Sequence, residues 1–174
     1  GTLRRLGTYD AIIAAAADRS PDSIDPAALD ALRLAVHQLL ATRVASHAAV
    51  NESVNLVATE SGRGASSFAN AVLRRITRES GEEWQTRIEQ HARSDDERLA
   101  LRAAHPVWVI RALRRALAAE GRGEELEALL EADNASPDVT LVALPGLAEP
   151  GEPRLPYAST AFVSPGGDPR RAVE

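Results

Sequence analysis

Residues 64–78 read GASSFANAVLRRITR, and this stretch predicts the helix around which the fold is organised. Three apolar side chains share one face of that helix because they recur at every fourth position: Phe68, Val72 and Ile76. Its last turn carries three arginines: Arg74, Arg75 and Arg78. Cations favour a helix C-terminus, so these arginines indicate either helix-dipole complementation or a surface that binds anions. The sequence leaves both interpretations open.

Upstream of this stretch, apolar periodicity predicts three helices, at residues 9–19, 25–41 and 46–59. Thr8 is expected to cap the first helix, and Asp25 followed by Pro26 is typical of a helix start. The sequence SGRG at residues 61–64 separates the third helix from the stretch described above. Four helices joined by short connections favour a helical bundle.

Downstream, the chain is predicted to continue as a second, smaller group of helices. Residues 79–93 read as a charged linker or a weak helix, and Ser94 is expected to cap a short helix after it. Two further helices are predicted at residues 107–120 and 124–133.

The last part of the chain differs from the rest because prolines and glycines replace the helical pattern. A β-branched run at residues 139–144 predicts a strand, and residues 157–163 predict a second one. The fold class is therefore mainly α, a helical bundle followed by a smaller helical group and a short β-containing segment. We predict three parts with boundaries at 1–79, 80–138 and 139–174.

Composition and charge restrict the classes of function. The chain has no cysteine, which excludes a disulfide, a thiolate nucleophile and a cysteine-based metal site. Neither a signal-peptide pattern nor an apolar run long enough for a membrane span is present, so we expect a soluble, cytoplasmic protein. All 20 basic residues are arginine, and the net charge is −5. Residues 1–78 hold nine arginines against seven acids, whereas residues 79–138 hold eight against fourteen, so only the first part favours phosphate binding.

Several other polar residues have two interpretations each. Arg111, Arg114 and Arg115 form a second basic cluster, which we interpret as a solvated face near neighbouring acids. Asn51, Glu52 and Asn70 are candidates for contacts either with a neighbouring helix or with RNA. A pairing of Glu52 with His47 would be the only candidate for an independent active site, and nothing in the sequence converges on it.

Several segments, in order and spacing, resemble one known family. They are LRLAVHQLL at residues 32–40, AAVNESV at 48–54, FANAVLRR at 68–75, GTLRR at 1–5, HPVW at 105–108 and NASPDVTL at 134–141. Together they are similar to the NusB-like domain and following region of the bacterial 16S ribosomal RNA cytosine-5 methyltransferases, the RsmB family, also called Fmu or Sun. The resemblance extends to about Leu144, and the first helices of the NusB-like domain are expected to be missing.

The resemblance implies an RNA-binding role without catalysis by these residues. Full-length members transfer a methyl group from S-adenosylmethionine with two cysteines of a separate catalytic domain, which follows the region seen here. No catalytic or metal residue is therefore carried over, and no cofactor is expected in this segment. The antitermination factor NusB binds RNA, so five arginines are expected to contact phosphates: Arg4, Arg5, Arg74, Arg75 and Arg78.

The expected function is thus RNA recognition on behalf of a cytosine-5 methyltransferase. The expected partners are 16S ribosomal RNA or the small ribosomal subunit, and the protein's own C-terminal methyltransferase domain; no membrane is expected. Two alternatives lack methyltransferase activity: a protein-interaction scaffold, favoured by the acidic residues 79–138, and a NusB-type transcription antitermination factor. A stand-alone enzyme has the least support, because no catalytic constellation is visible.

Overall fold

The structure is a computed structural model that describes residues 1–164; residues 165–174 lie outside the described part. The chain divides into two compact units, residues 1–132 and residues from 133 onward. The predicted boundary at residue 79 is not tested by this division and stays a prediction.

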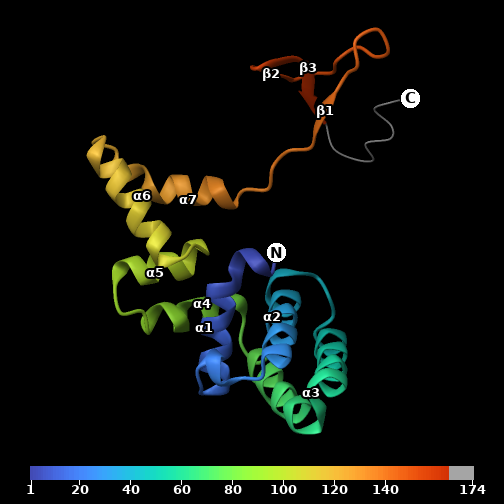
Figure 1. Cartoon of the computed structure of the whole chain (residues 1–174), viewed down its shortest axis with the longest axis vertical. Helices are drawn as coiled ribbons and strands as arrows, with labels where there is room; N and C mark the ends of the chain where they lie inside the picture. The colour runs from blue at the N-terminus through green and yellow to red at the C-terminus, as the bar shows by residue number, and fades with distance from the viewer. Residues whose placement is uncertain (165–174) are drawn as a thin grey trace. The chain divides into compact units, whose positions relative to one another are not determined.

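Seven α-helices are described in residues 1–164 (Figure 1). They are α1 (Leu6–Ala17), α2 (Pro26–Ala41), α3 (Ser46–Ile76), α4 (Gly81–Gln90), α5 (Asp95–Ala103), α6 (Val107–Ala119) and α7 (Leu126–Asn134). Short 3-10 turns precede three of them: η1 (Leu3–Arg5), η2 (Pro21–Ser23) and η3 (Gly123–Glu125). The mainly α fold class is confirmed.

Local capping explains where several of these helices begin. The Asp25 carboxylate accepts a hydrogen bond from the Ala28 amide at 3.0 Å, as predicted for the start of α2. Ser94 likewise accepts from the Glu97 amide at 3.2 Å and caps α5. Both sequence predictions are confirmed, because a cap depends only on residues within one turn.

The long helix α3 is two helices joined at a kink. Gly62 has φ +83°, a left-handed conformation that glycine adopts without the steric cost of a side chain. The predicted break at residues 61–64 is therefore confirmed. The Ser61 hydroxyl donates to the Asp25 carboxylate at 2.5 Å and so ties the kink to the start of α2.

One local prediction was wrong. The first helix begins at Leu6, so Thr8 lies within it; its buried hydroxyl donates to the Leu101 carbonyl at 2.8 Å instead of capping the helix. For residues 79–93, predicted as a charged linker or a weak helix, the structure has a helix at residues 81–90. Ser80 and Glu83 form a complete capping box at its start, which stabilises a short charged helix.

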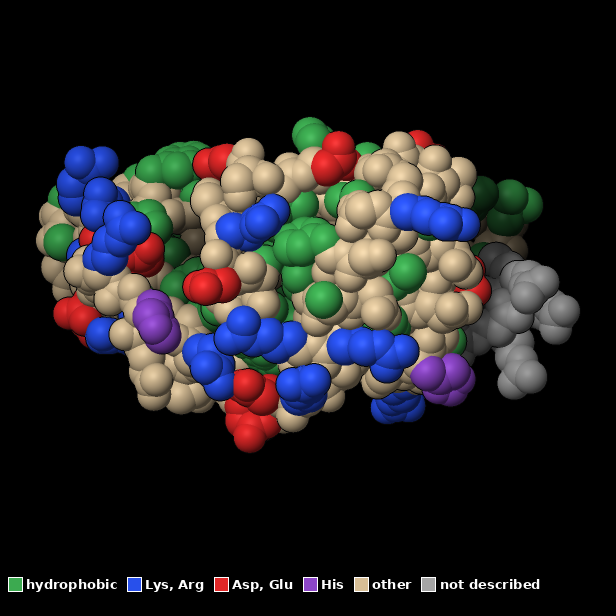
Figure 2. Space-filling model, turned by 90° about the horizontal axis from the view of Figure 1, so that it is seen from below, with side chains coloured by type: hydrophobic (Ala, Val, Ile, Leu, Met, Phe, Trp, Pro, Cys, Tyr) green, Lys and Arg blue, Asp and Glu red, His purple; other side chains and the backbone are tan. Residues whose placement is uncertain are grey.

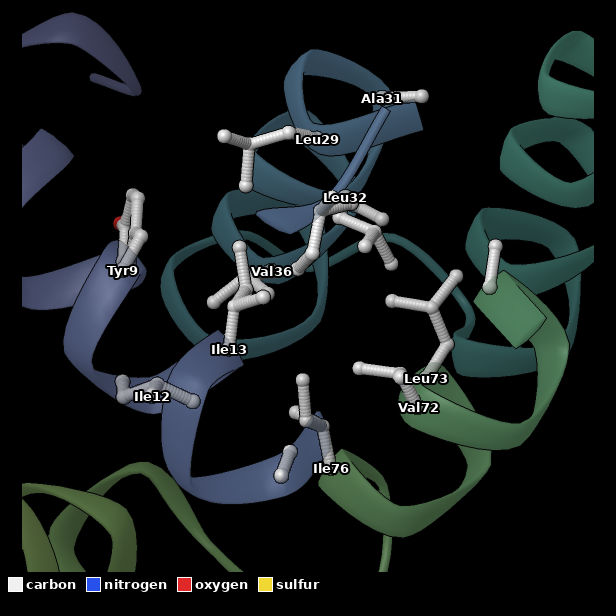
Figure 3. Close-up of a cluster of buried hydrophobic side chains, with 14 of the residues drawn as sticks. Tyr9, Ile12, Ile13, Leu29, Ala31, Leu32, Val36, Val72, Leu73 and Ile76 are labelled. Atoms are coloured by element: carbon white, nitrogen blue, oxygen red, sulfur yellow. The ribbon is translucent and has the colours of Figure 1, made fainter. Parts of the chain in front are cut away.

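The main core lies between α1, α2, α3 and α4 (Figure 3). Its fully buried members include Ile13 from α1, Leu32 and Val36 from α2, and Leu73 and Ile76 from α3. The apolar face predicted for residues 64–78 is thus confirmed. Burial of these side chains holds the arginine-bearing end of α3 against α1.

Trp84 extends this core under the end of α3. Its side chain is fully buried, and its indole Nε1 donates to the Ile76 carbonyl at 3.0 Å. That carbonyl belongs to the last turn of α3, where backbone acceptors have no partner within the helix. Trp84 therefore both packs against the end of α3 and completes its hydrogen bonding.

A second cluster of buried side chains joins α5, α6 and α7. It contains Leu99, Ala100, Ile110, Leu126 and Leu130. This smaller core matches the predicted second group of helices.

The second unit contains a small antiparallel sheet. Its strands are β1 (Thr140–Val142), β2 (Arg154–Leu155) and β3 (Ala158–Val163), in the order β1-β3-β2. The predicted strands at 139–144 and 157–163 correspond to β1 and β3, whereas β2 was not predicted. Ala143, Ala161 and Phe162 are buried on it.

Candidate nucleic-acid interface

All five arginines predicted to contact RNA are exposed. Arg4 and Arg5 lie in η1, ahead of the first helix, whereas Arg74 and Arg75 occupy the last turn of α3 and Arg78 follows its end. Figure 2 shows blue arginine side chains spread over the face that it presents, several of them along its lower edge, with red acidic side chains between some of them. The residues that bind each of the five arginines determine how much of its positive charge is available to a ligand.

Arg74 is held in place by a neutral neighbour. Its Nε donates to the Asn70 side-chain oxygen at 3.2 Å, one helical turn earlier. Among residues 1–164 no carboxylate forms an ion pair with Arg74. The terminal Nη1 and Nη2 groups therefore keep the parallel geometry that suits two oxygens of one phosphate.

Arg75 is partly committed to the fold. Its Nη1 donates to the Ala16 carbonyl at 3.0 Å, near the end of α1. Carbonyls at a helix C-terminus lack partners within the helix, so this bond links the ends of α1 and α3. Arg75 therefore stabilises the contact between α1 and α3 and also contributes positive charge.

The positive charge of Arg78 is not offset by the neighbouring acid, because that acid pairs with another arginine. Glu79 forms an ion pair with Arg87, with Arg87 Nη2 at 2.8 Å from Glu79 Oε1. No ion pair to Arg78 is present in the part of the chain that the structure describes. The end of α3 thus presents at least two cations, Arg74 and Arg78, without a bound carboxylate.

Near the start of the chain, Arg5 lies close to a buried polar pair. The Tyr9 hydroxyl and His37 Nδ1 are 2.8 Å apart. Burial lowers the pKa of His37, and nearby cations that include Arg5 lower it further. Both effects favour the neutral form of the His37 side chain.

Two arginines of the second basic cluster, on α6, share one carboxylate. Arg111 Nε lies 3.2 Å from one oxygen of Asp96, and Arg114 Nη2 lies 2.9 Å from the other. The interpretation of this cluster as a solvated face near acids is confirmed for these two arginines.

A cleft of about 650 Å³ opens between the two halves of α3. His47 and Asn51 line it from the first half, and Asn70, Arg74 and Thr77 line it from the second. Sequence reasoning missed this cleft because it treated the two helices separately. The available signal was the glycine break followed by asparagines on both sides.

No group of three or more histidine or acidic side chains that could hold a metal ion occurs in residues 1–164. In the same residues, no helix is both long enough and apolar enough to span a membrane.

Comparison with known proteins gives matches over nearly the whole chain. Residues 1–78 match the NusB family. A Mycobacterium tuberculosis protein named as a candidate methyltransferase is 41% identical over 180 residues, which cover 98% of this chain and 39% of that protein. The ribosomal RNA small subunit methyltransferase B of Pseudomonas putida is 31% identical over 141 residues, which cover 81% of this chain and 29% of that protein. No solved structure matches.

These matches confirm the family resemblance drawn from the sequence segments. The chain spans 39% of the length of the M. tuberculosis relative, so it corresponds to one region of a longer protein in that comparison.

Proposed function

We propose that this chain, whose residues 1–78 belong to the NusB family, binds ribosomal RNA on behalf of a cytosine-5 methyltransferase. The observation that carries the proposal is the exposed end of α3, where Arg74 and Arg78 have no carboxylate partner among residues 1–164. Arginines in this state bind phosphate without first breaking an ion pair. The names of the matched relatives support ribosomal RNA as the ligand.

The proposal assigns methyl transfer to a part of the full-length protein other than these residues. S-adenosylmethionine would be the methyl donor there, and the partner of this chain would be the catalytic domain of the same protein. The cysteine-free sequence supports this division of labour, because the chain has no thiolate to attack a cytosine.

A scaffold that holds other domains is the second candidate, and one observation favours it. Residues 79–138 carry fourteen acids against eight arginines, and Asp96 binds two of these arginines. An acidic surface repels RNA. Under this alternative the arginines of α3 would matter for stability alone.

The test is binding of the chain to a fragment of 16S ribosomal RNA across a salt series. The informative variant is Arg74→Ala/Arg78→Ala, because Arg75 also holds α1 and its loss would mix binding with stability. Each lost phosphate contact should make the dependence of log affinity on log salt shallower by about 1. The matched control, Arg111→Ala/Arg114→Ala, removes the same charge from two arginines that already share the Asp96 carboxylate.

The proposal predicts a shallower slope and weaker binding for the α3 variant, with a smaller change for the control. Equal effects of the two variants would show a response to net charge alone. Absence of binding by the unsubstituted chain at low salt would remove the RNA role and favour the scaffold.

A further inference from the structure

We propose that the cleft between the two halves of α3 binds a single unpaired nucleotide of the RNA, with its phosphate on Arg74. This inference rests on the proposed function and adds the part of the ligand that the cleft recognises. The cleft volume, about 650 Å³, lies in the range of about 300–1,000 Å³ typical of small-ligand sites. It is formed within one helical hairpin, so the kink at Gly62 sets its shape.

The cleft offers apolar surface to the face of a base. Val50, which is 8% exposed, and the half-buried Val54 both line it. A nucleobase has two flat, weakly hydrated faces, so contact between such a face and apolar side chains is favourable for any base. A bare anion such as sulfate would gain nothing from this surface.

Polar groups line the same cleft and are free to bind a base edge. His47 and Asn51 are exposed, and neither side chain forms a hydrogen bond within residues 1–164. The Asn51 amide offers both a donor and an acceptor, which matches the paired groups on the edge of a base. Asn70 orients Arg74 from the opposite wall.

The charge of the cleft fits one phosphate and no more. Arg74 is the single arginine among the residues that line it, and Glu52 is the single carboxylate. A site for several phosphates would need more cations, whereas Glu52 can accept a hydrogen bond from an exocyclic amino group of a base. The combination favours a nucleotide over a polyphosphate.

An unpaired nucleotide is required because a base within a duplex cannot enter the cleft. In paired RNA the base edges lie in the grooves and the faces are stacked, so side chains mainly reach phosphates and sugar hydroxyls. Arg78 follows Thr77 of the cleft wall and remains available for phosphates of either RNA form. We therefore expect phosphate binding by Arg74 to depend more strongly on whether the RNA is paired than phosphate binding by Arg78.

The test compares two RNAs of equal length, one unpaired and one fully paired, by fluorescence anisotropy with the 174-residue chain. The variant is Asn51→Ala, which removes an exposed amide that the fold does not use. Asn55→Ala is the matched control, because Asn55 is exposed on the same helix and lies outside the cleft.

We expect Asn51→Ala to weaken binding of the unpaired RNA about 5- to 10-fold, with an unchanged salt slope. The affinity of Asn51→Ala for the paired RNA should stay within about twofold of that of the unsubstituted chain. The affinities of Asn55→Ala for both RNAs should stay within the same limit. Arg74→Ala/Arg78→Ala should weaken both RNAs and reduce the salt slope.

Three outcomes would overturn the nucleotide site. The first is an Asn51→Ala effect no larger than that of Asn55→Ala, and the second is equal affinity of the unsubstituted chain for both RNAs. Either result, with Arg74→Ala/Arg78→Ala still impaired, leaves RNA binding by the arginines intact and removes the cleft from it. If neither RNA binds at low salt, the proposed function fails together with this inference.

Discussion

The end of α3 and the middle of α6 carry similar arginine-rich sequences in different electrostatic states. Residues 73–78 read LRRITR, and residues 111–115 read RALRR. On α6, both oxygens of Asp96 bind arginines, at 3.2 Å and 2.9 Å. At the end of α3, the nearest acid in sequence, Glu79, binds Arg87 instead. The number of arginines in a segment therefore does not determine how much positive charge is available there to a ligand.

The difference arises from what packs beside each helix. Asp96 lies in the first turn of α5, which contacts α6 through the smaller core. The end of α3 instead packs on Trp84 and α1: Trp84 contributes apolar surface and an indole N–H, and α1 contributes apolar groups and the Ala16 carbonyl. Carbonyls orient arginines without cancelling their charge, whereas a carboxylate does both.

The largest expected effect comes from removing the support under the end of α3. Trp84→Ala leaves a cavity and removes the indole hydrogen bond to the Ile76 carbonyl, so the free energy of unfolding should fall by about 3–5 kcal/mol. Trp108→Ala is the matched control, because Trp108 is 72% exposed and its loss should cost less than about 0.5 kcal/mol. Urea denaturation followed by circular dichroism measures both. Equal losses would show that Trp84 does not support the end of α3.

A second substitution should leave Arg111 and Arg114 of α6 without a carboxylate partner among residues 1–164, as Arg74 and Arg78 are at the end of α3. Asp96→Asn keeps the size of the side chain and removes the carboxylate charge that Arg111 and Arg114 share. RNA affinity below 0.1 M salt should rise, by up to about tenfold, because released arginines attract phosphate. Asp95→Asn provides the control, since Asp95 pairs with Arg98 alone and is 93% exposed. An equal rise in both variants would indicate a general charge effect.

The smallest expected effect separates Arg75 from Arg74 within the same turn. Arg75→Ala loses the hydrogen bond to the Ala16 carbonyl and should cost roughly 1 kcal/mol of stability. Arg74→Ala loses only a bond to a side chain one turn away, so its stability should change by less than about 0.5 kcal/mol. Thermal denaturation of both variants compares them directly. A larger loss for Arg74→Ala would contradict the structural role given to Arg75.

The sequence predicts those parts of this picture that depend on neighbours within a turn or two. The cap at Asp25, the break at Gly62 and the apolar face of residues 64–78 all follow from local rules. The capping box of Ser80 and Glu83 was also readable from its spacing, although the high charge of α4 concealed it.

The remaining features depend on residues far apart in the chain. Arg75 reaches Ala16 across 59 positions, and Thr8 reaches Leu101 across 93. Neither partner has a local signal, because any exposed carbonyl can accept such a bond. The cleft of α3 likewise depends on residues far apart in the chain, because its walls come together only through the kink at Gly62.

The most direct test follows individual arginines during RNA binding. In the chain labelled with 15N-arginine, each Nε–Hε group gives its own NMR signal, which shifts when the guanidinium binds phosphate. On titration with a 16S ribosomal RNA fragment, we expect the signals of Arg74 and Arg78 to shift first. Those of Arg111 and Arg114 should stay near their starting positions. Shifts at Arg111 and Arg114 without shifts at Arg74 and Arg78 would contradict the assignment of RNA binding to the end of α3.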